Sequence, residues 1–323
     1  MSRPEFIYAP ALPDDFRCRV PLRETRQLYV VNGTVQGAGA PLSIRMEKGQ
    51  AMDKMLQIIA IRNDEGPAEL SFGEDFHFAE GSSGRILHCS HTFAPTEFVT
   101  SEKVNISLER DASVEFTVMQ HEHSRAAHET LFNISLGEGA CLNLVVITLN
   151  GGKVVNRINA SLNGEHADCR LSGLYLTGGS QKADTSVELI HSVPHCSSNQ
   201  LFKGILDQEG KASFYGLIRV VPDAQKTEAY QANHNLLLSD SARATTQPQL
   251  EIYADDVKCS HGATVGKLRE DELFYMRTRG IPDSEARILQ QMAFAYEVLE
   301  RIYSPELRER LLSLVERRLR GTL

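Results

Sequence analysis

Residues 136–147 read LGEGACLNLVVI, a tight polar corner followed at once by a run of strand-forming residues. Leu136 ends one apolar run, Gly137 and Gly139 supply the conformational freedom of a turn, and Ala140 precedes the next run. Leu, Val and Ile dominate the residues after this Ala, and the β-branched ones among them favour extended strands. The segment therefore predicts a short corner that leads directly into a new β-strand.

The same corner, in which Leu precedes a polar turn and Ala precedes a new strand, recurs along the chain. Its five copies close at Ala112, Ala140, Ala167, Ala212 and Ala242. The intervals between them are similar except for the longer one from Ala167 to Ala212, which we interpret as two shorter turns of the same winding. Units of this size cannot bury an apolar face alone and gain stability by stacking, as in a β-solenoid. A β-sandwich or jelly roll also has regularly spaced turns and stays open as the alternative.

Strand-length apolar runs dominate the body of the chain, which contains almost no long amphipathic helical pattern. Representative runs lie at residues 114–118, 142–147, 171–176 and 214–220. We therefore predict a mainly β protein with a β-helix at residues 28–265, after a short N-terminal segment at residues 1–27. The composition, 41% hydrophobic and 24% charged, is typical of a globular chain with a large core.

Helix-forming residues replace the strand pattern after Gly266, so we predict a C-terminal helical domain at residues 266–323. One amphipathic stripe, at steps of three and four, consists of Ile288, Met292, Ala295, Leu299 and Ile302. Ser304 followed by Pro305 is typical of a helix N-terminus, and a second stripe follows at Leu307, Leu311, Val315 and Leu319. The simplest expectation is that both stripes pack on each other and on the end of the solenoid. A partner-docking face is the alternative.

The net charge of −8 argues against a nucleic-acid partner, because phosphate binding requires a clustered basic surface. The first residues contain no apolar run of the signal-peptide type, and no later stretch reaches the length of a membrane span. The six cysteines form no Cys-x-x-Cys pair, which indicates neither a zinc knuckle nor a secreted disulfide framework. We therefore expect a cytoplasmic protein that contacts neither nucleic acid nor membrane.

Residues 251–266 contain the densest group of side chains suited to metal chemistry, including Cys259 and His261. In a strand, residues two apart point to the same side, so this thiol and this imidazole would share one face. Such a pair suits iron, but two ligands fall short of the four that usually close a tetrahedral site, so a second chain would have to complete it. Alternatively, Cys259 fills an internal ladder and His261 makes only local hydrogen bonds.

The segments LEIYADDVKCSHGAT at residues 250–264 and LFYMRTRGI at residues 273–281 resemble the signature of the SufB/SufD family of SUF iron-sulfur cluster assembly proteins. The similarity covers residues 200 to 303. It implies a right-handed parallel β-helix with a C-terminal α-helical domain, in agreement with the strand pattern. Gly262 stands where the SufB branch has a Glu after the His, which favours the SufD branch.

The resemblance implies a non-catalytic scaffold subunit that pairs with a SufB-like subunit through its C-terminal strands and docks a SufC-like ABC-type ATPase. His261 and Cys259 match positions that the family places at or near the subunit interface. A transient iron-sulfur cluster would be shared there with the partner, and the isolated chain would bind none tightly. Self-pairing as a homodimer, the presence of FAD in the complex and the identity of the client proteins stay open. Residues 1–27 are shorter than the helical N-terminal segment of typical members, so its role here also stays open.

By the same resemblance, the ATPase-docking surface lies between residues 271 and 302. The residues that we expect to form it are Leu273, Phe274, Tyr275, Arg277, Arg279, Met292, Tyr296 and Leu299.

A second hypothesis, of a different class, is a cupin-like metal-dependent enzyme. His121 and His123, followed by Glu129, approximate a motif of two His and one Glu on adjacent strands. The Glu falls one position late, and exposed polar residues on a sheet face or turn explain the group more simply. A scaffold predicts little tightly bound metal in the isolated chain, whereas this enzyme predicts stoichiometric metal.

His88, Cys89, Ser90 and His91 repeat the Cys-Ser-His order of residues 259–261. Because they lie outside the signature, we interpret them as a buried Cys beside turn histidines. The sequence contains no GxxxxGK[ST] phosphate loop, no convincing nucleophile elbow and no paired-carboxylate pattern. We therefore expect no enzymatic activity, and any ATP-driven step would come from a partner.

Overall fold

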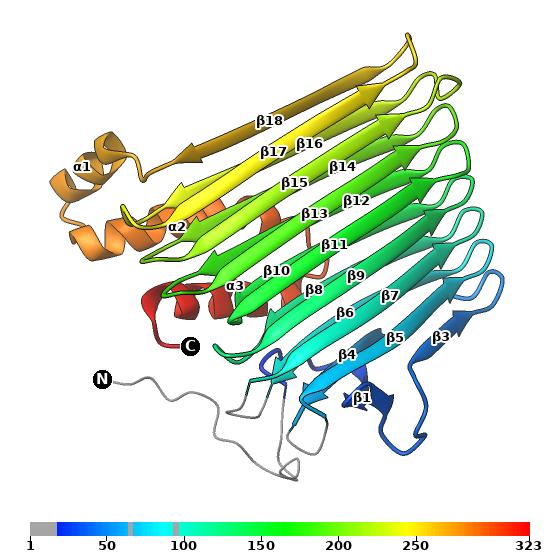
Figure 1. Ribbon diagram of the computed structural model, residues 1–323, viewed down its shortest axis with the longest axis horizontal. Helices are drawn as coiled ribbons and strands as arrows, with labels where there is room; N and C mark the ends of the chain where they lie inside the picture. The colour runs from blue at the N-terminus through cyan, green and yellow to red at the C-terminus, as the bar shows by residue number, and fades with distance from the viewer. Residues whose placement is uncertain (1–17, 64–66, 93–96) are drawn as a thin grey trace.

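The computed structural model describes residues 18–63, 67–92 and 97–323, which form a parallel β-solenoid flanked by three helices (Figure 1). Most of the predicted N-terminal segment, residues 1–17, lies outside the described residues. Along most of the solenoid, successive strands alternate between two sheets, so β8 (Ser113–His121) pairs in parallel with β10 (Cys141–Asn150). The prediction of a mainly β protein with a parallel β-helix is confirmed, and the sandwich alternative is wrong.

The two sheets stack turn on turn, from β1 at the bottom of Figure 1 to β18 at the top. Sheet A contains, in spatial order, β18 (Lys258–Gly266), β16 (Glu228–Leu237), β14 (Ser197–Leu206), β12 (Asp168–Thr177), β10, β8, β6 (Ser83–Thr92), β4 (Met55–Arg62), β1 (Thr25–Val31) and β2 (Thr34–Val35). Sheet B contains β17 (Arg243–Ile252), β15 (Lys211–Val220), β13 (Lys182–His191), β11 (Lys153–Leu162), β9 (Ala127–Leu136), β7 (Val99–Leu108), β5 (Glu69–Phe78) and β3 (Ser43–Met46). The long strands of neighbouring turns pair along their whole length, as β9 does with β11, so each turn repeats the outline of the one before.

The predicted corners are present, but the interpretation of the long interval from Ala167 to Ala212 as two shorter turns is wrong. Ala112, Ala140 and Ala167 are buried and each precedes a strand of sheet A, whereas Ala212 lies at the start of β15 in sheet B. The interval therefore spans a whole turn and part of the next. In sheet A the corner position one turn after Ala167 is held by the buried Cys196, because a small thiol packs much as a methyl group does.

The main core lies between the two sheets, because alternate residues of each strand point inward. Along β9, for example, exposed or half-buried positions alternate strictly with buried ones. Aromatic pairs join the sheets: the ring centroids of Phe76 and Phe116 lie 5.0 Å apart, and those of Phe202 and Phe214 lie 5.1 Å apart. Each turn thus completes the core of the turn beside it.

Sheet A also buries much of its outer face, which α2 (Asp283–Leu299) and α3 (Pro305–Arg320) cover, while α1 (Glu270–Thr278) packs on α2. Leu299 and Leu311 of these helices share one apolar cluster with Leu174 and Leu176 of β12. The expectation that the helices pack on the end of the solenoid is therefore wrong: they lie on its side (Figure 1), because the outward residues of sheet A are apolar there. No described helix is long and apolar enough to span a membrane.

Polar contacts from a buried lysine and a half-buried arginine fix the helices on sheet A. The Lys203 side chain of β14 is 3% exposed, and its Nζ lies 2.5 Å from Glu297 Oε2 and 4.3 Å from the centroid of the Phe294 ring. From α3, Arg318 Nε donates a hydrogen bond to the Leu149 carbonyl oxygen at 2.8 Å. These contacts hold the outer surface of the helices at a defined position relative to the strands.

Replacing Gly204 with Ala should destabilise the solenoid. Gly204 lies in β14, and a methyl group there would clash with the Tyr175 ring and the Asn235 amide. Overpacking of this kind costs about 1–3 kcal/mol of unfolding free energy, which urea denaturation would measure. Gly262→Ala in β18 is the matched control, because nothing lies within 4 Å of the added methyl, and it should change stability by less than about 0.5 kcal/mol. Equal effects in the two variants would contradict the described packing of β14.

Candidate functional site

The last turn of the solenoid, formed by β17 and β18, lies at an open end (Figure 1). Within the described part of the chain, β18 has a ladder only with β16, and β17 only with β15. Nearly all residues of β18 are exposed. The outer edges of both strands therefore offer unpaired backbone groups, and such edges favour pairing with strands of another chain.

Cys259 and His261 lie two residues apart in β18, on the same face. The strand register aligns them with Ala229 and Gln231 of β16, which are both buried in the interior. The two side chains therefore face the mouth of the last turn. Cys259 is half-buried against an apolar cluster that contains Ala229, and burial raises the pKa of its thiol, whereas His261 is exposed. Cys259 thus continues an internal ladder, and His261 stands open to solvent.

Backbone hydrogen bonds determine which groups of β18 face the open edge. The Lys258 N–H donates to the Thr227 carbonyl oxygen at 2.9 Å, on the side of β16. In a parallel ladder, successive residues direct their backbone groups to alternate sides of the strand. The N–H groups of Cys259, His261 and Ala263 therefore point to the open edge.

The predicted docking residues differ sharply in exposure. Phe274 and Tyr275 of α1 and Tyr296 of α2 have 62%, 58% and 43% of their surface exposed. Leu273 and Leu299 are fully buried, so their assignment as direct docking residues is wrong. Leu299 packs in the cluster between helices and sheet A, and Leu273 is the buried residue of α1.

The other three predicted docking residues surround the exposed aromatic side chains or support them. Met292 is half-buried against the cluster between helices and sheet A. Arg277 lies 3.5 Å from Asp283, and the Arg279 guanidinium lies 5.1 Å from the centroid of the Tyr275 ring. Exposed aromatic residues with neighbouring arginines are typical of protein–protein interfaces.

The structure does not bring the cupin-like residues together. His121 lies at the end of β8 and lines a pocket beside α3, whereas Glu129 belongs to sheet B, where its carboxylate lies 2.7 Å from Arg157 Nε. The metal motif is therefore not formed. The interpretation of the histidines as exposed polar groups is also wrong, because His121 and His123 are buried, and burial with nearby cations lowers the pKa of His121 well below its usual value.

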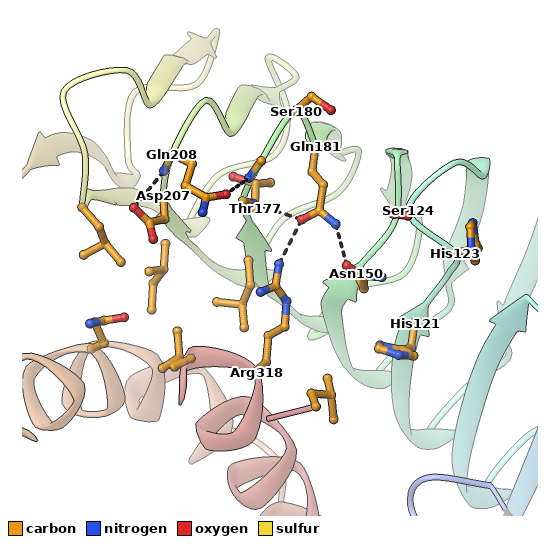
Figure 2. A pocket seen from close by; sticks show the side chains of 18 of the residues that line it. His121, His123, Ser124, Asn150, Thr177, Ser180, Gln181, Asp207, Gln208 and Arg318 are labelled. Carbon is orange, nitrogen blue, oxygen red and sulfur yellow. Dashed lines mark hydrogen bonds between the residues drawn. The ribbon is translucent and has the colours of Figure 1, made fainter. Parts of the chain in front are cut away.

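The pocket beside α3 has a volume of about 400 Å³ (Figure 2). Arg318 reaches across it from α3 and donates to Gln181 Oε1 at 2.9 Å, and Gln181 Nε2 donates to Asn150 Oδ1 at 2.5 Å. His121 and His123 lie on the far side of Asn150 from the Gln181 bond. Because Arg318 forms hydrogen bonds from α3 to residues of the solenoid, we interpret these polar groups as holding α3 on the solenoid.

A cluster of ionisable side chains that no sequence motif predicted lies inside the solenoid. His88 of β6 lies between Glu74 of β5 and Glu102 of β7, with His88 Nε2 3.1 Å from Glu74 Oε2 and 3.3 Å from Glu102 Oε1. All three residues are buried, and His88 lies within a strand, so its interpretation as a turn histidine is wrong. Burial opposes protonation of His88, but the two carboxylates outweigh it and raise its pKa to about 9; burial raises the pKa of Glu74.

Cys89 and His91 of β6 alternate with His88 and face outward, where Cys18 covers them. Cys18 Sγ lies 3.4 Å from His91 Nε2, and all three residues are buried. A hydrogen bond with Cys89, opposed by burial and reinforced by His91, lowers the pKa of the Cys18 thiol. The interpretation of Cys89 as buried is confirmed, but His91 lies in a strand. The long separation of Cys18 along the chain hid this cluster from motif analysis.

These features define a class of protein: a parallel β-solenoid with an open last turn and a helical flank that carries exposed aromatic side chains. The family model described as SUF system FeS cluster assembly, SufBD core domain, matches residues 76–294, more than half of the chain. The chain therefore belongs to the SufB/SufD family of iron-sulfur cluster assembly proteins. The match begins well before residues 200 to 303, on which the resemblance rested.

One curated relative that matches along most of the chain is a SufD protein. The iron-sulfur cluster assembly protein SufD of Escherichia coli K12 is 31% identical over 313 residues, which cover 96% of this chain and 72% of that protein. A SufBD family protein of Synechocystis is 38% identical over 208 residues, 64% of this chain and 46% of its own length. One of Mycobacterium leprae is 33% identical over 202 residues, 60% of this chain and 50% of its own length. The chain thus resembles SufD along almost its whole length and spans about half of the other two relatives.

Two proline substitutions test the assigned register of β18. Ala263→Pro removes an N–H that faces the open edge, so β18 should stay paired with β16. Thr264→Pro removes an N–H directed at β16 and should fray the strand, at a cost of about 1–3 kcal/mol for the unsatisfied carbonyl. Amide hydrogen exchange should show β16 protected in the first variant and exposed in the second. Equal loss of protection in both would contradict the register.

Proposed function

We propose that this chain is a non-catalytic scaffold subunit of an iron-sulfur cluster assembly complex. Its last turn pairs with a SufB-like subunit, the cluster is built beside His261 and Cys259, and the helical flank docks a SufC-like ABC-type ATPase. One observation carries the proposal: the exposed His261 imidazole on β18, a strand whose outer edge is unpaired in the described chain, within the region that the family model matches.

The last turn supports pairing with another solenoid. Its exposed edge includes large apolar side chains, with Tyr253 60% and Val265 44% exposed. A long exposed edge of this kind invites uncontrolled aggregation unless a partner covers it. A SufB-like subunit with its own open turn would continue both sheets across the interface. A second copy of this chain is the competing partner, and light scattering of the isolated chain distinguishes the two.

His261 and Cys259 suit iron but cannot complete an iron site alone. Imidazole and thiolate are both iron ligands, and an iron centre with only two of them needs further ligands from another chain. The cluster is then a cargo held at a shared interface. Cys259 must lose its proton to bind metal, and burial opposes that loss. The exposed His261 is therefore our first choice for an iron ligand.

The helical flank supports docking of an ATPase. The sequence lacks a GxxxxGK[ST] loop, so another subunit would hydrolyse ATP. Phe274 and Tyr275 offer an apolar contact, and Lys203 and Arg318 fix the helices to sheet A. Movement of a docked ATPase would therefore be transmitted to the strands. The six free cysteines fit a reducing compartment, and we place the complex in the cytoplasm.

His261→Ala should lower the iron and acid-labile sulfide of the complex by roughly tenfold or more, because it removes an imidazole ligand without touching the backbone edge. The measurement is co-purification of the tagged chain with its SufB-like and ATPase partners, followed by iron and sulfide assay. Ser260→Ala is the matched control, because Ser260 lies next to His261 on the opposite face of β18 and should leave both contents unchanged. Unchanged iron in His261→Ala would overturn the assignment of His261, and failure to retain any partner would overturn the scaffold proposal.

Replacing Phe274 and Tyr275 together with Ala should release the ATPase while leaving the SufB-like partner bound. The two side chains are exposed, so the fold should tolerate their loss, whereas deletion of the helices would uncover Leu174 and Leu176 of sheet A. Truncating one central apolar contact of an interface costs about 2 kcal/mol or more at a hot spot, so the loss of even one of the two would weaken ATPase binding by at least about 30-fold in a pull-down titration. Val99→Ala removes an exposed apolar residue of β7, away from the helices, and should change nothing. Undiminished ATPase binding would place the docking site elsewhere.

A further inference from the structure

The buried cluster around His88 has no role in the proposed function. It lies inside the solenoid in the N-terminal turns, between sheet B, which supplies Glu74, Glu102 and His128, and sheet A, which supplies His88. Their exposed fractions are 0% for Glu74, 4% for Glu102, 4% for His128 and 2% for His88. Burying carboxylates and imidazoles to this degree is costly unless opposite charge compensates them.

The atoms that face one another in this cluster lack hydrogen-bond partners in the described part of the chain. Both carboxylate oxygens of Glu74, His88 Nε2 and Glu102 Oε1 are buried without one, although His88 Nε2 lies 3.1 Å and 3.3 Å from the two glutamates. His88 and the two glutamates therefore lie at ion-pair distance, and these oxygens have no further hydrogen-bond partner in the described residues. Three ligand atoms, one from each residue, lie within 4.8 Å of one another.

The two separations from His88 Nε2 are compatible with atoms that share one metal ion. Ligand atoms bound at about 2.1 Å, at tetrahedral or octahedral angles, lie about 3.0–3.4 Å from each other. Both measured separations from His88 Nε2 fall in that range. Two carboxylates and one imidazole are nitrogen and oxygen ligands, which suit Fe²⁺, Mn²⁺ and Zn²⁺ and not the sulfur-seeking Cu⁺.

A second layer of contacts holds Glu102 in position. Glu102 Oε2 accepts hydrogen bonds from Thr130 at 3.4 Å and from His128 Nε2 at 3.2 Å, which leaves Oε1 facing His88. The other ring nitrogen of His128, Nδ1, lies 3.3 Å from Glu122 Oε1. Carboxylates that bind metal ions in proteins are in turn hydrogen-bonded by an outer layer of residues, as Glu102 is here.

Space for an additional small ligand lies beside the cluster. A cavity of about 10 Å³ is bordered by Glu102, Glu122 and His128, and by Arg62 and Thr100. That volume is close to the minimum that one water molecule needs, and the carboxylates of Glu102 and Glu122 are among the groups that border it. Of the three residues Glu74, His88 and Glu102, Glu102 is the one that borders this cavity, so a water there would lie on the Glu102 side of the cluster.

We propose that Glu74, His88 and Glu102 bind one divalent first-row transition metal ion of the Fe²⁺ class inside the β-helix, with His128 as a positioning residue for Glu102. The site belongs to a single chain, so it goes beyond the scaffold function and stands or falls without it. It is also distinct from the open edge, because it lies in the turns at the other end of the stack.

The test is anaerobic titration of the purified full-length chain, without partners, with Fe²⁺ and separately with Co²⁺ as a spectroscopic probe. We expect about one ion per chain, a raised melting temperature in the presence of the ion, and Co²⁺ ligand-field bands without thiolate-to-cobalt charge transfer. The absence of charge transfer separates this site from the Cys18, Cys89 and His91 cluster and from Cys259. Glu102→Gln should weaken binding by at least about tenfold, because it removes a charged ligand while keeping its shape.

Glu129→Gln is the matched control, because Glu129 lies in the same sheet but pairs on the surface with Arg157, and its binding should equal that of the wild type. Glu74→Gln provides a second variant, since the Glu74 oxygens have no hydrogen-bond partner in the described part of the chain, and it should also lose the ion. Circular dichroism would verify that each variant is folded. The proposal is overturned if the wild type binds no stoichiometric ion, if bound Co²⁺ shows thiolate charge transfer, or if a folded Glu102→Gln or Glu74→Gln variant binds as the wild type does.

Discussion

The parallel hydrogen-bonded ladder between successive turns is the constraint on which the rest of this structure depends. A single turn contributes two strands, whose ladder hydrogen bonds are made with the strands of adjacent turns. It is therefore stable only when it packs on its neighbours. At the last turn the ladder continues no further within the described chain, and β17 and β18 keep open edges. The unpaired edges that support a pairing function are thus a direct consequence of stacking. The last turn of any such stack has strands whose outer backbone groups are free to pair with another chain.

The second consequence of the ladder is a sheet with two faces to bury. The inward face of sheet A closes on sheet B, and much of its outward face is apolar and requires a cover, which α2 and α3 provide. The helices are therefore committed to the sheet through residues such as Leu299 and Leu311, and only their outer surface, with Tyr296 and the α1 residues Phe274 and Tyr275, remains for a partner. The inner surface of the helices therefore stabilises the fold, and their outer surface is available for a partner.

The two metal-handling candidates differ in how visible they are in a sequence. Cys259 and His261 are two residues apart, and the alternation of a strand alone predicts that they share a face. Glu74, His88 and Glu102 lie on three successive strands and meet only because half a turn of the solenoid separates consecutive members across the two sheets. Local periodicity cannot predict that these three residues meet, because their positions relative to one another depend on the length of every corner between the strands. The cupin-like group shows the reverse error: His121 and Glu129 are close in sequence, but they lie in sheet A and sheet B and are not brought together.

By itself the sequence determined the elements: corner spacing predicted stacked turns, apolar runs predicted the positions of strands that prove longer than the runs, and stripes at steps of three and four predicted α2 and α3. These features depend on neighbouring residues, whose conformations are set by local sterics and side-chain periodicity. Only the tertiary structure decided which sheet each corner feeds, that the helices cover the side of the solenoid, that Leu273 and Leu299 are buried while Phe274 is exposed, and that His88 faces inward between two glutamates. The physical reason is that the burial of a residue depends on what packs around it, and in a solenoid much of that packing comes from the adjacent turns.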